Sequence, residues 1–518
     1  MELVKKNIHM DRTKAVASAQ ITLGDDINIS DSRPDAERLV CEKGSVILEE
    51  VRAVEDHVIV KGRLSFMVMY LSETAAPCSM EGALPFEEQV YMEGVRSGEG
   101  ISSRCLLEDL TVGLINSRKL SVQALVSIAL SSEVIYDEEP AVELYHEVPV
   151  EYRKKPLRIA GMTVRKRDIL RIREEVALSQ NQPNIARILW QSIEPAGVVF
   201  KAQEGGLSVH GELKVFFLYE SEGEEPAVCI QEAVLPFHGR VECSGCDEGM
   251  AEDVTYTFTH KEVEIRPDFD GEQRLFALEV IMDMDIRLYA EERLEILSGV
   301  YGVTQEIETA GRPAVFKSLV ARAEGRAKCT GRLKAGADAP AVMQILHSEV
   351  QVQPEQEEVT ENGLRISGSL VWNCLYQSTD QKQPYASLRD ILPFSCELET
   401  PALPEDCLFR IQAEAEQPSV SVLDHREADV RTVVSCRALI FEQKEEEIIT
   451  DMTISDLDMN KLNDLPGMVI YIVKEGDSLW DIGKRYYVPI SSLRETNGLT
   501  SEEIRPGDKL LVVKGIND

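Results

Sequence analysis

The chain repeats itself three times on the scale of a whole domain. Proline-led segments align at 34–40, 183–189 and 340–346, and each is followed by a long apolar stretch in which a glycine and a tyrosine stand eight residues apart. A Leu-Pro-Phe triplet then recurs at 84–86, 235–237 and 392–394. The glycine advances by 149 and then by 157 residues, so the repeating unit is a domain and not a short solenoid turn.

The repeats carry the pattern of β-strands. Val58, Val60, Leu64 and Phe66 alternate along one stretch and place apolar side chains on one face, while the embedded Gly62 indicates a bend or a bulge. The proline-led segments are compatible with one helical turn each. We therefore predict a mainly β fold of three tandem β-rich repeat domains, built as sandwiches or twisted sheets and followed by a small βααβ domain.

The predicted domain boundaries follow these patterns. The three repeats occupy 1–150, 151–310 and 311–445, a polar linker occupies 446–467, and the small domain occupies 468–514. In the small domain, an apolar stretch that includes Ile470 and Ile472 can pair with residues 510–513 as a two-stranded sheet.

Two helices are expected between those strands. Ser478-x-x-Asp481 and Ser492-x-x-Glu495 both have the spacing of a capping box, in which a hydroxyl and a carboxylate satisfy the first helical turn. Leu479, Ile482 and Tyr486 then fall on one face of the first helix, and Asn497-Gly498 ends the second.

The C-terminal segment resembles a LysM module. The resemblance rests on Gly-Asp-Ser-Leu-Trp at 476–480, Asn-Gly at 497–498 and Arg-Pro-Gly-Asp at 505–508. It implies binding of N-acetylated glycans in a groove between two segments, where backbone amides meet acetamido groups. The implied groove residues are Gly476, Asp477, Ser478, Leu479, Gly498, Leu499 and Thr500.

The first helix departs from the LysM pattern and has a second face. LysM modules more often have Ala at Gly483, and Gly or another small residue at Tyr487. Trp480, Lys484 and Tyr487 share a face, which makes them candidates for an exposed patch that contacts a protein, since aromatic anchors dominate many interfaces. The alternative is that Trp480 packs on the edge of the small sheet.

The net charge and the N-terminal residues limit which partners and which cellular location we expect. The net charge is −35, and nearly all of the excess acid lies in the repeats, so nucleic acid is not an expected partner. The acidity indicates either solubility or a basic partner. Charges interrupt the first twelve residues and no long apolar run follows, so we expect no export signal, no membrane span and a cytoplasmic location. The 11 scattered cysteines suit free thiols.

No catalytic constellation is evident in the repeats. What the three copies share is apolar, whereas an active site needs converging polar or titratable groups. The eight histidines do not cluster, and Cys243-x-x-Cys246 lacks a second pair that would complete a zinc site. We therefore predict a protein that is not an enzyme, with no cofactor and no metal.

Three such repeats followed by one LysM module resemble the clostridial spore-coat morphogenetic proteins, whose repeats are called SPOCS domains. The resemblance implies a protein of the mother-cell cytosol that binds the coat-basement ATPase, stage IV sporulation protein A, through its LysM module and helps the coat encase the forespore. Two alternatives stay open. One is a protein that binds peptidoglycan or N-acetylglucosamine in the wall or spore cortex, and the other is an enzyme that uses Cys243 and Cys246.

Overall fold

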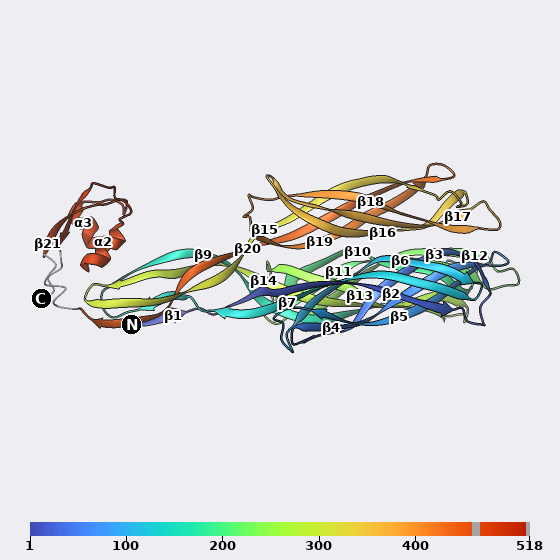
Figure 1. The fold of residues 1–518 in the computed structure, drawn as a ribbon, viewed down its shortest axis with the longest axis horizontal. Coiled ribbons are helices and arrows are strands. Elements are labelled where there is room, and N and C mark those ends of the chain that lie inside the picture. Colours follow the sequence, from blue (N-terminus) through green and yellow to red (C-terminus); the bar gives the residue numbers. More distant parts are fainter. Residues whose placement is uncertain (458–466, 514–518) are drawn as a thin grey trace.

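The computed structural model describes residues 1–457 and 467–513. Within them the three repeats are β-rich, as predicted, and each folds into two three-stranded antiparallel sheets (Figure 1). In the first repeat the sheets have the orders β2-β7-β6 and β3-β4-β5. Their bounds are Ile8–Asn28 for β2, Ala36–Val54 for β3, His57–Ser72 for β4, Pro77–Tyr91 for β5, Ile101–Asn116 for β6 and Lys119–Glu138 for β7.

The second and third repeats have the same topology. The sheets are β9-β14-β13 and β10-β11-β12, then β15-β20-β19 and β16-β17-β18. The second repeat comprises β9 (Val150–Ala177), β10 (Ile185–Gln203), β11 (Gly206–Ser221), β12 (Val228–Glu242), β13 (Ala251–Pro267) and β14 (Gln273–Gly302). The third comprises β15 (Gln305–Lys334), β16 (Val342–Thr360), β17 (Gly363–Ser378), β18 (Tyr385–Glu399), β19 (Cys407–Val422) and β20 (Glu427–Asp456).

The repeated tyrosine holds the start of each repeat in place. Its hydroxyl donates a hydrogen bond to the carbonyl oxygen of the repeat's leading proline, from Tyr70 to Pro34 at 3.1 Å, from Tyr219 to Pro183 at 3.4 Å and from Tyr376 to Pro340 at 3.0 Å. The sequence had suggested one helical turn in each of these segments, but they are not helical in the structure. Instead, a strand begins two residues after each proline, and its first residue pairs with a serine of the next strand, as Ala36 does with Ser72.

The repeated glycine makes room for the phenylalanine of the Leu-Pro-Phe triplet. Gly62 pairs with Phe86, and a Cβ at Gly62 would lie 2.8 Å from the Phe86 ring. The predicted bulge lies on the neighbouring strand, where the register shifts at Leu48 and Glu50 opposite the glycine. The triplet's proline lies on the edge strand β5, where its missing N–H breaks no ladder bond.

Equivalent residues of the three repeats meet in one shared core. Met69, Leu218 and Leu375, each seven residues after the repeated glycine, lie in one buried cluster. Ser387 in β18 donates to the carbonyl of Val40 in β3 at 2.7 Å, so the third repeat also contacts the first directly. The repeats therefore pack as one body and not as separate beads.

The long strands β9, β14, β15 and β20 run beyond the sandwiches and form a narrow stalk at one end (Figure 1). The strands β14, β15 and β20 each have 30 residues, a length of about 100 Å at ~3.3 Å per residue. The stalk also includes β1 (Glu2–Lys5) paired with β8 (Ala141–Tyr145). Its core includes Leu144, Leu297, Val300, Ile307 and Ile449.

A small domain lies beside the end of the stalk and has the predicted βααβ order (Figure 1). The strands β21 (Met468–Ile472) and β22 (Lys509–Val513) pair antiparallel around α2 (Leu479–Tyr486) and α3 (Ile490–Asn497). Ser478 caps α2 through a capping box, as predicted. The second predicted cap is wrong, because α3 starts after Pro489 and Ser492 lies inside the helix. Proline suits a helix start, since its φ is already near the helical value.

The chain continues as a strand where a linker was expected at 446–467. The strand β20 runs to Asp456 paired with β15, and Ile448 and Ile449 are buried there, so this part of the linker prediction is wrong. The rest of the predicted linker, residues 458–466, lies outside the described residues. Among the helices of the described residues, none is long and apolar enough to cross a membrane.

Candidate binding site

The loop before α2 forms the first half of the predicted groove. The Asp477 carboxylate accepts hydrogen bonds from the Tyr471 hydroxyl at 2.7 Å and from the Lys474 N–H at 2.8 Å. The Tyr471 hydrogen bond is the main reason that the pKa of Asp477 lies below its ordinary value. Gly476 turns the chain with a φ of 87°, a region that glycine adopts without steric cost. Asp477 thus shapes the loop, and Leu479 packs in the domain core.

The segment after α3 forms the second half. Gly498 ends the helix in the left-handed region with a φ of 62°, and the Leu499 N–H donates to the carbonyl of Arg494 at 2.9 Å. Asn497 joins the end of α3 to β22: its side-chain amide donates to the carbonyl of Leu511, and its side-chain oxygen accepts from the Leu511 N–H. Gly476, Gly498 and Thr500 are exposed, so both predicted edges of the groove face solvent.

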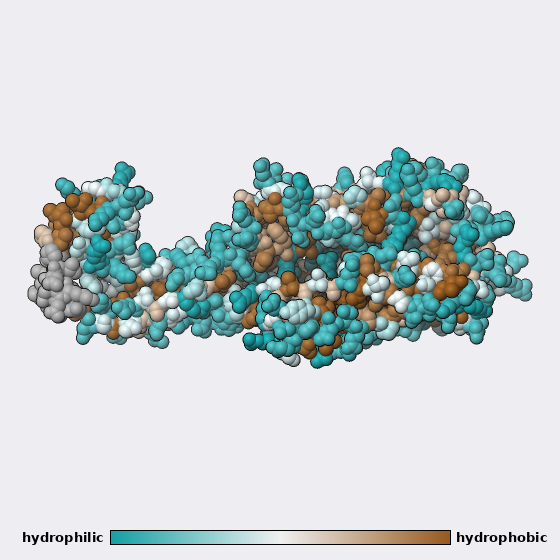
Figure 2. All heavy atoms as spheres, viewed as in Figure 1, coloured by the Kyte–Doolittle hydropathy of each residue, from teal (hydrophilic) through white to brown (hydrophobic). Residues whose placement is uncertain are grey.

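The outer side of the small sheet is a surface that sequence reasoning did not single out. Met468, Ile470 and Ile472 are exposed by 63%, 69% and 56% and follow one another on the same side of β21. We call these three residues the sheet face. Figure 2 shows brown, hydrophobic spheres gathered on this domain. Every residue of β21 is apolar or aromatic, so alternation could not tell which side would be buried.

The α2 face, formed by Trp480, Lys484 and Tyr487, is only partly free. Trp480 is 8% exposed, so the expectation that it is exposed is wrong. It packs on the stalk instead of on its own sheet edge: its ring lies 4.8 Å from the Tyr301 ring, edge to face, and the Arg153 guanidinium lies 5.0 Å from its ring centroid. Lys484 is exposed and Tyr487 is half-buried.

Tyr301 in β14 also donates a buried hydrogen bond to the carbonyl of Val488 at 3.0 Å. Burial, reinforced by Glu151 and Glu502, raises the pKa of Tyr301 well above its ordinary value, so the hydroxyl keeps the proton that it donates. The contact explains Gly483, because a Cβ there would lie 2.4 Å from the Tyr301 hydroxyl oxygen. Tyr487 has a φ of 55°, the conformation for which glycine is usual at a helix end.

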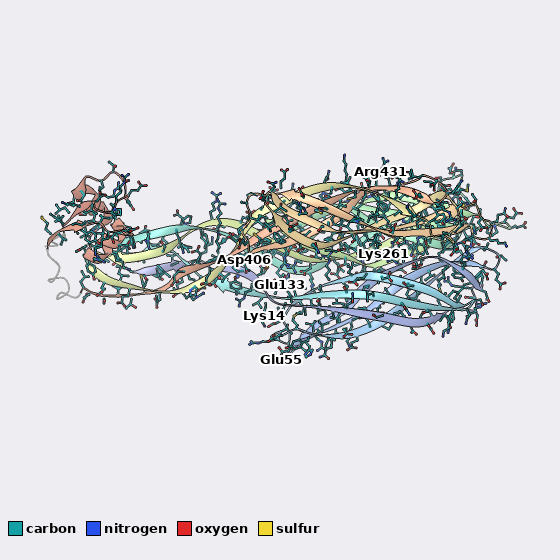
Figure 3. All side chains as sticks on the ribbon, turned by 45° about the horizontal axis from the view of Figure 1, so that its top comes forward. Lys14, Glu55, Glu133, Lys261, Asp406 and Arg431 are labelled. Carbon is teal, nitrogen blue, oxygen red and sulfur yellow. The ribbon has the colours of Figure 1, made fainter. Side chains whose placement is uncertain are left out.

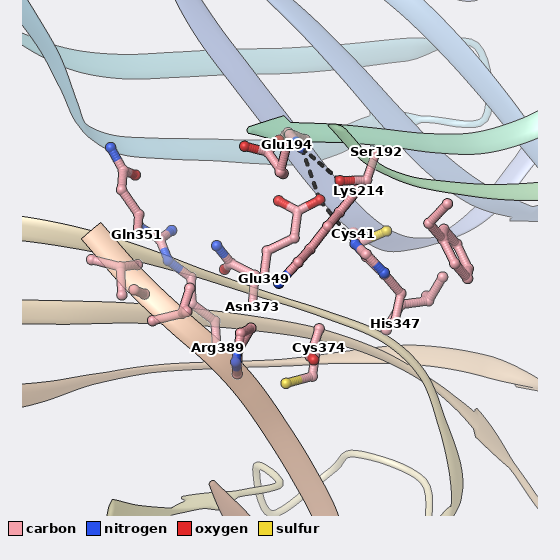
Figure 4. A pocket seen from close by; sticks show the side chains of 18 of the residues that line it. Cys41, Ser192, Glu194, Lys214, His347, Glu349, Gln351, Asn373, Cys374 and Arg389 are labelled. Carbon is pink, nitrogen blue, oxygen red and sulfur yellow. Dashed lines mark hydrogen bonds and ion pairs between the residues drawn. The ribbon is translucent and has the colours of Figure 1, made fainter. Parts of the chain in front are cut away.

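A cavity of about 1080 Å³ lies between the three repeats, and residues from all of them line it (Figure 4). Lys43 donates to Glu194 at 2.6 Å, to Glu349 at 2.8 Å and to Ser192 at 3.3 Å. Lys43, Ser192 and Glu349 each stand nine residues after the leading proline of their repeat. The principal charges of the cavity are therefore paired with one another and hold the repeats together.

The pair Cys243 and Cys246 does not line this cavity and is buried. The Cys246 thiol donates to the carbonyl of Gly206, and burial raises the pKa of Cys243, which disfavours the nucleophilic thiolate. In the part of the chain that the structure describes, no group of three or more His, Cys, Asp or Glu side chains could hold a metal ion.

The structure buries Trp480 on the stalk and leaves Gly476, Gly498 and Thr500 exposed, while a groove between the two segments stays a prediction. Sequence reasoning missed Arg153, Gly299 and Tyr301 as neighbours of Trp480. No local pattern could have found them, because the hydrogen bond from Tyr301 joins residues 187 positions apart.

Comparison with protein families agrees with this architecture. The family model described as "SipL, SPOCS domain" matches residues 35–115, 184–266 and 341–423, and the model described as "LysM domain" matches residues 471–513. Each SPOCS match begins beside a repeated proline and covers the middle strands of its repeat. Both are binding-type domains. No solved structure matches the chain. The chain therefore contains three SPOCS domains followed by a C-terminal LysM domain.

Proposed function

We propose that this chain is a non-catalytic adaptor of spore-coat assembly. In this proposal its LysM domain binds the coat-basement ATPase, stage IV sporulation protein A, and helps the coat encase the forespore from the mother-cell cytosol. The domain content supports a role in sporulation. The partner and the coat role are inferences of ours from the resemblance and from the surface of the LysM domain.

The observation that carries the proposal is the exposed sheet face of Met468, Ile470 and Ile472. Three adjacent apolar side chains offer no hydrogen bonds to a sugar, but they suit the apolar centre of a protein interface. Lys484 and Tyr487 on the α2 face are proposed as further contacts, together with the turn at Ser478. The Leu479 side chain is buried in the domain core and is not proposed as a contact.

A matched pair of substitutions tests this assignment. Ile472 in the LysM domain and Ile391 in β18 of the third repeat have the same residue type and the same 56% exposure. We expect Ile472→Asp to weaken binding of the purified ATPase by at least about tenfold, because a charge would be buried in the interface, whereas Ile391→Asp should bind as wild type does. Equal binding by both variants would contradict the role of the sheet face.

A second function, glycan binding, is favoured by the exposed groove edges at Gly476, Gly498 and Thr500. Backbone amides on such edges can meet the acetamido groups of N-acetylated sugars. Sedimentation of the full chain with purified peptidoglycan at moderate salt distinguishes glycan binding from binding of the ATPase. Strong retention of wild type and of Ile472→Asp alike, with no binding of the ATPase, would favour the glycan function.

A further inference from the structure

The paired strands β9 and β14 end in a surface that fits the LysM domain. On these strands the surface consists of Glu151, Arg153, Gly299 and Tyr301, and on the LysM domain of Trp480, Gly483, Val488 and Ile490; together they form the docking contact. An aromatic pair, a cation over the Trp480 ring and a buried hydrogen bond meet there. The Ile490 N–H also donates a hydrogen bond to the Glu151 carboxylate.

Glycines on both sides allow the two surfaces to approach closely. A Cβ at Gly299 would lie 2.9 Å from Cζ2 of Trp480, and a Cβ at Gly483 would lie 2.4 Å from the Tyr301 hydroxyl oxygen. Neither site has room for a methyl group. The fit is therefore close at two independent points, which favours a specific contact over a loose encounter.

The docking contact covers one surface of the LysM domain and leaves two others open. Trp480 is buried against β9 and β14, whereas the sheet face, Gly476, Gly498 and Thr500 stay exposed. Trp480 would otherwise be a large aromatic anchor next to Lys484, and residues of this kind carry much of the binding energy in protein interfaces.

We propose that the end of the paired strands β9 and β14 is an intramolecular latch, which holds the LysM domain through Trp480 and competes with the protein partner for the α2 face. This inference rests on the proposed function, because it concerns the regulation of the same domain. A partner that contacts Trp480 must first break the hydrogen bond from Tyr301 to Val488. The body of the protein thus lowers the apparent affinity of its own LysM domain in proportion to the fraction that is undocked.

The docking itself can be measured without a partner. The full chain has three tryptophans, and Trp190 and Trp372 are buried in the repeats. Labelling with 5-fluorotryptophan gives one fluorine resonance for each of them, and the third resonance reports on Trp480. We expect Gly299→Ala and Arg153→Ala each to move this resonance towards that of a solvent-exposed indole. Gly113→Ala is the matched control, because Gly113 also lies in a strand but a Cβ there would meet nothing within 4 Å. An unmoved Trp480 resonance in both release variants would overturn the latch.

Affinity for the purified ATPase then tests the competition. We expect Gly299→Ala to bind about tenfold more tightly than wild type, the change for a latch that leaves roughly a tenth of the molecules undocked. Gly113→Ala should match wild type. Release of Trp480 with no gain in affinity would overturn the competition while leaving the proposed function intact. If wild type and the released variants all failed to bind the ATPase, both the proposed function and the competition would be contradicted. The fluorine spectra would still show whether the LysM domain docks on the stalk.

Discussion

Lys43 joins the three repeats through a single ammonium group. It lies in β3 of the first repeat, and its partners Ser192 and Glu349 occupy the equivalent positions of the second and third repeats. Burial alone would raise the pKa of Glu349, but the Lys43 ammonium and His347 outweigh burial and hold that pKa well below its ordinary value. Burial likewise opposes the charge of Lys43, but Glu194 and Glu349 outweigh it and raise the pKa of Lys43. The repeats are not interchangeable at this point, since one contributes the cation and another its counter-ion.

The low pKa of Glu349 predicts a loss of stability in acid. A carboxyl whose pKa is lower in the folded state than in the unfolded state stabilises the fold above the unfolded value of about 4.5, and this contribution is lost as the pH falls towards the folded value. We expect Glu349→Gln to reduce the free energy of unfolding by about 2 kcal/mol near neutral pH, and by progressively less below about pH 4.

Urea denaturation at several pH values measures this difference. Glu357→Gln, at an exposed position of the same strand β16, is the control and should follow wild type at every pH. A difference between wild type and Glu349→Gln that stays constant between neutral and acidic pH would show that the carboxylate charge is not what stabilises the junction.

Helix α2 shows how a local pattern and its surroundings combine at the scale of an element. The Ser478 hydroxyl accepts from the Asp481 N–H at 3.2 Å, while the Asp481 carboxylate accepts from the Ser478 N–H at 3.3 Å. Ser492 and Glu495 have the same spacing, but α3 has already begun two residues earlier. The spacing of a capping box therefore predicts a cap only where the preceding residues do not start the helix first.

Removing the Ser478 hydroxyl and removing the Ser492 hydroxyl should affect the stability of the helices differently. We expect Ser478→Ala to destabilise α2 by about 1 kcal/mol, because an N–H of the first turn loses its acceptor. The amide protons of residues 479–486 should then exchange with solvent about fivefold faster. Ser492→Ala, inside α3, is the control and should leave exchange in both helices nearly unchanged. Equal acceleration by the two substitutions would contradict the assignment of the caps.

At the scale of the whole molecule, charges from all three repeats meet around Glu133, whose place in the fold is labelled in Figure 3. The carboxylate of Glu133, from β7, lies 2.8 Å from Arg165, 3.1 Å from Arg287 and 3.0 Å from Arg410. Arg165 and Arg287 belong to the second repeat and Arg410 to the third. A second buried pair, Lys317 of β15 with Asp11 of β2 at 2.8 Å, links the third repeat to the first.

This junction predicts that the three repeats unfold together. We expect Glu133→Gln to lower the free energy of unfolding by about 3–5 kcal/mol, because three guanidiniums lose a shared buried counter-ion. The loss should appear in calorimetry as a downward shift of one transition for the three repeats. Glu50→Gln, which removes an exposed ion pair with Arg52, should cost about 0.5 kcal/mol or less. Separate transitions for the individual repeats would contradict the shared junction.

The sequence by itself determined the parts of this protein that depend on local order and spacing. The mainly β class, the three repeats, the βααβ domain and the capped start of α2 followed from apolar alternation, from the spacing of Gly, Tyr and Leu-Pro-Phe, and from the Ser478-x-x-Asp481 box. These signals are local because strand alternation and helix caps depend on neighbours within a few residues. The extension of β20 to Asp456 was missed, because its polar and charged residues are stabilised by pairing with β15, which is distant in sequence.

Only the tertiary structure decided which surfaces of the LysM domain are free. Trp480 has the same helical position whether it faces solvent or the stalk, and its neighbours Arg153 and Tyr301 lie in strands of the second repeat. The convergence of Lys43, Ser192 and Glu349 likewise depends on how the three repeats pack around one another. Contacts between residues so far apart carry no local pattern, since the chain between them can place them together or apart without changing any short-range spacing.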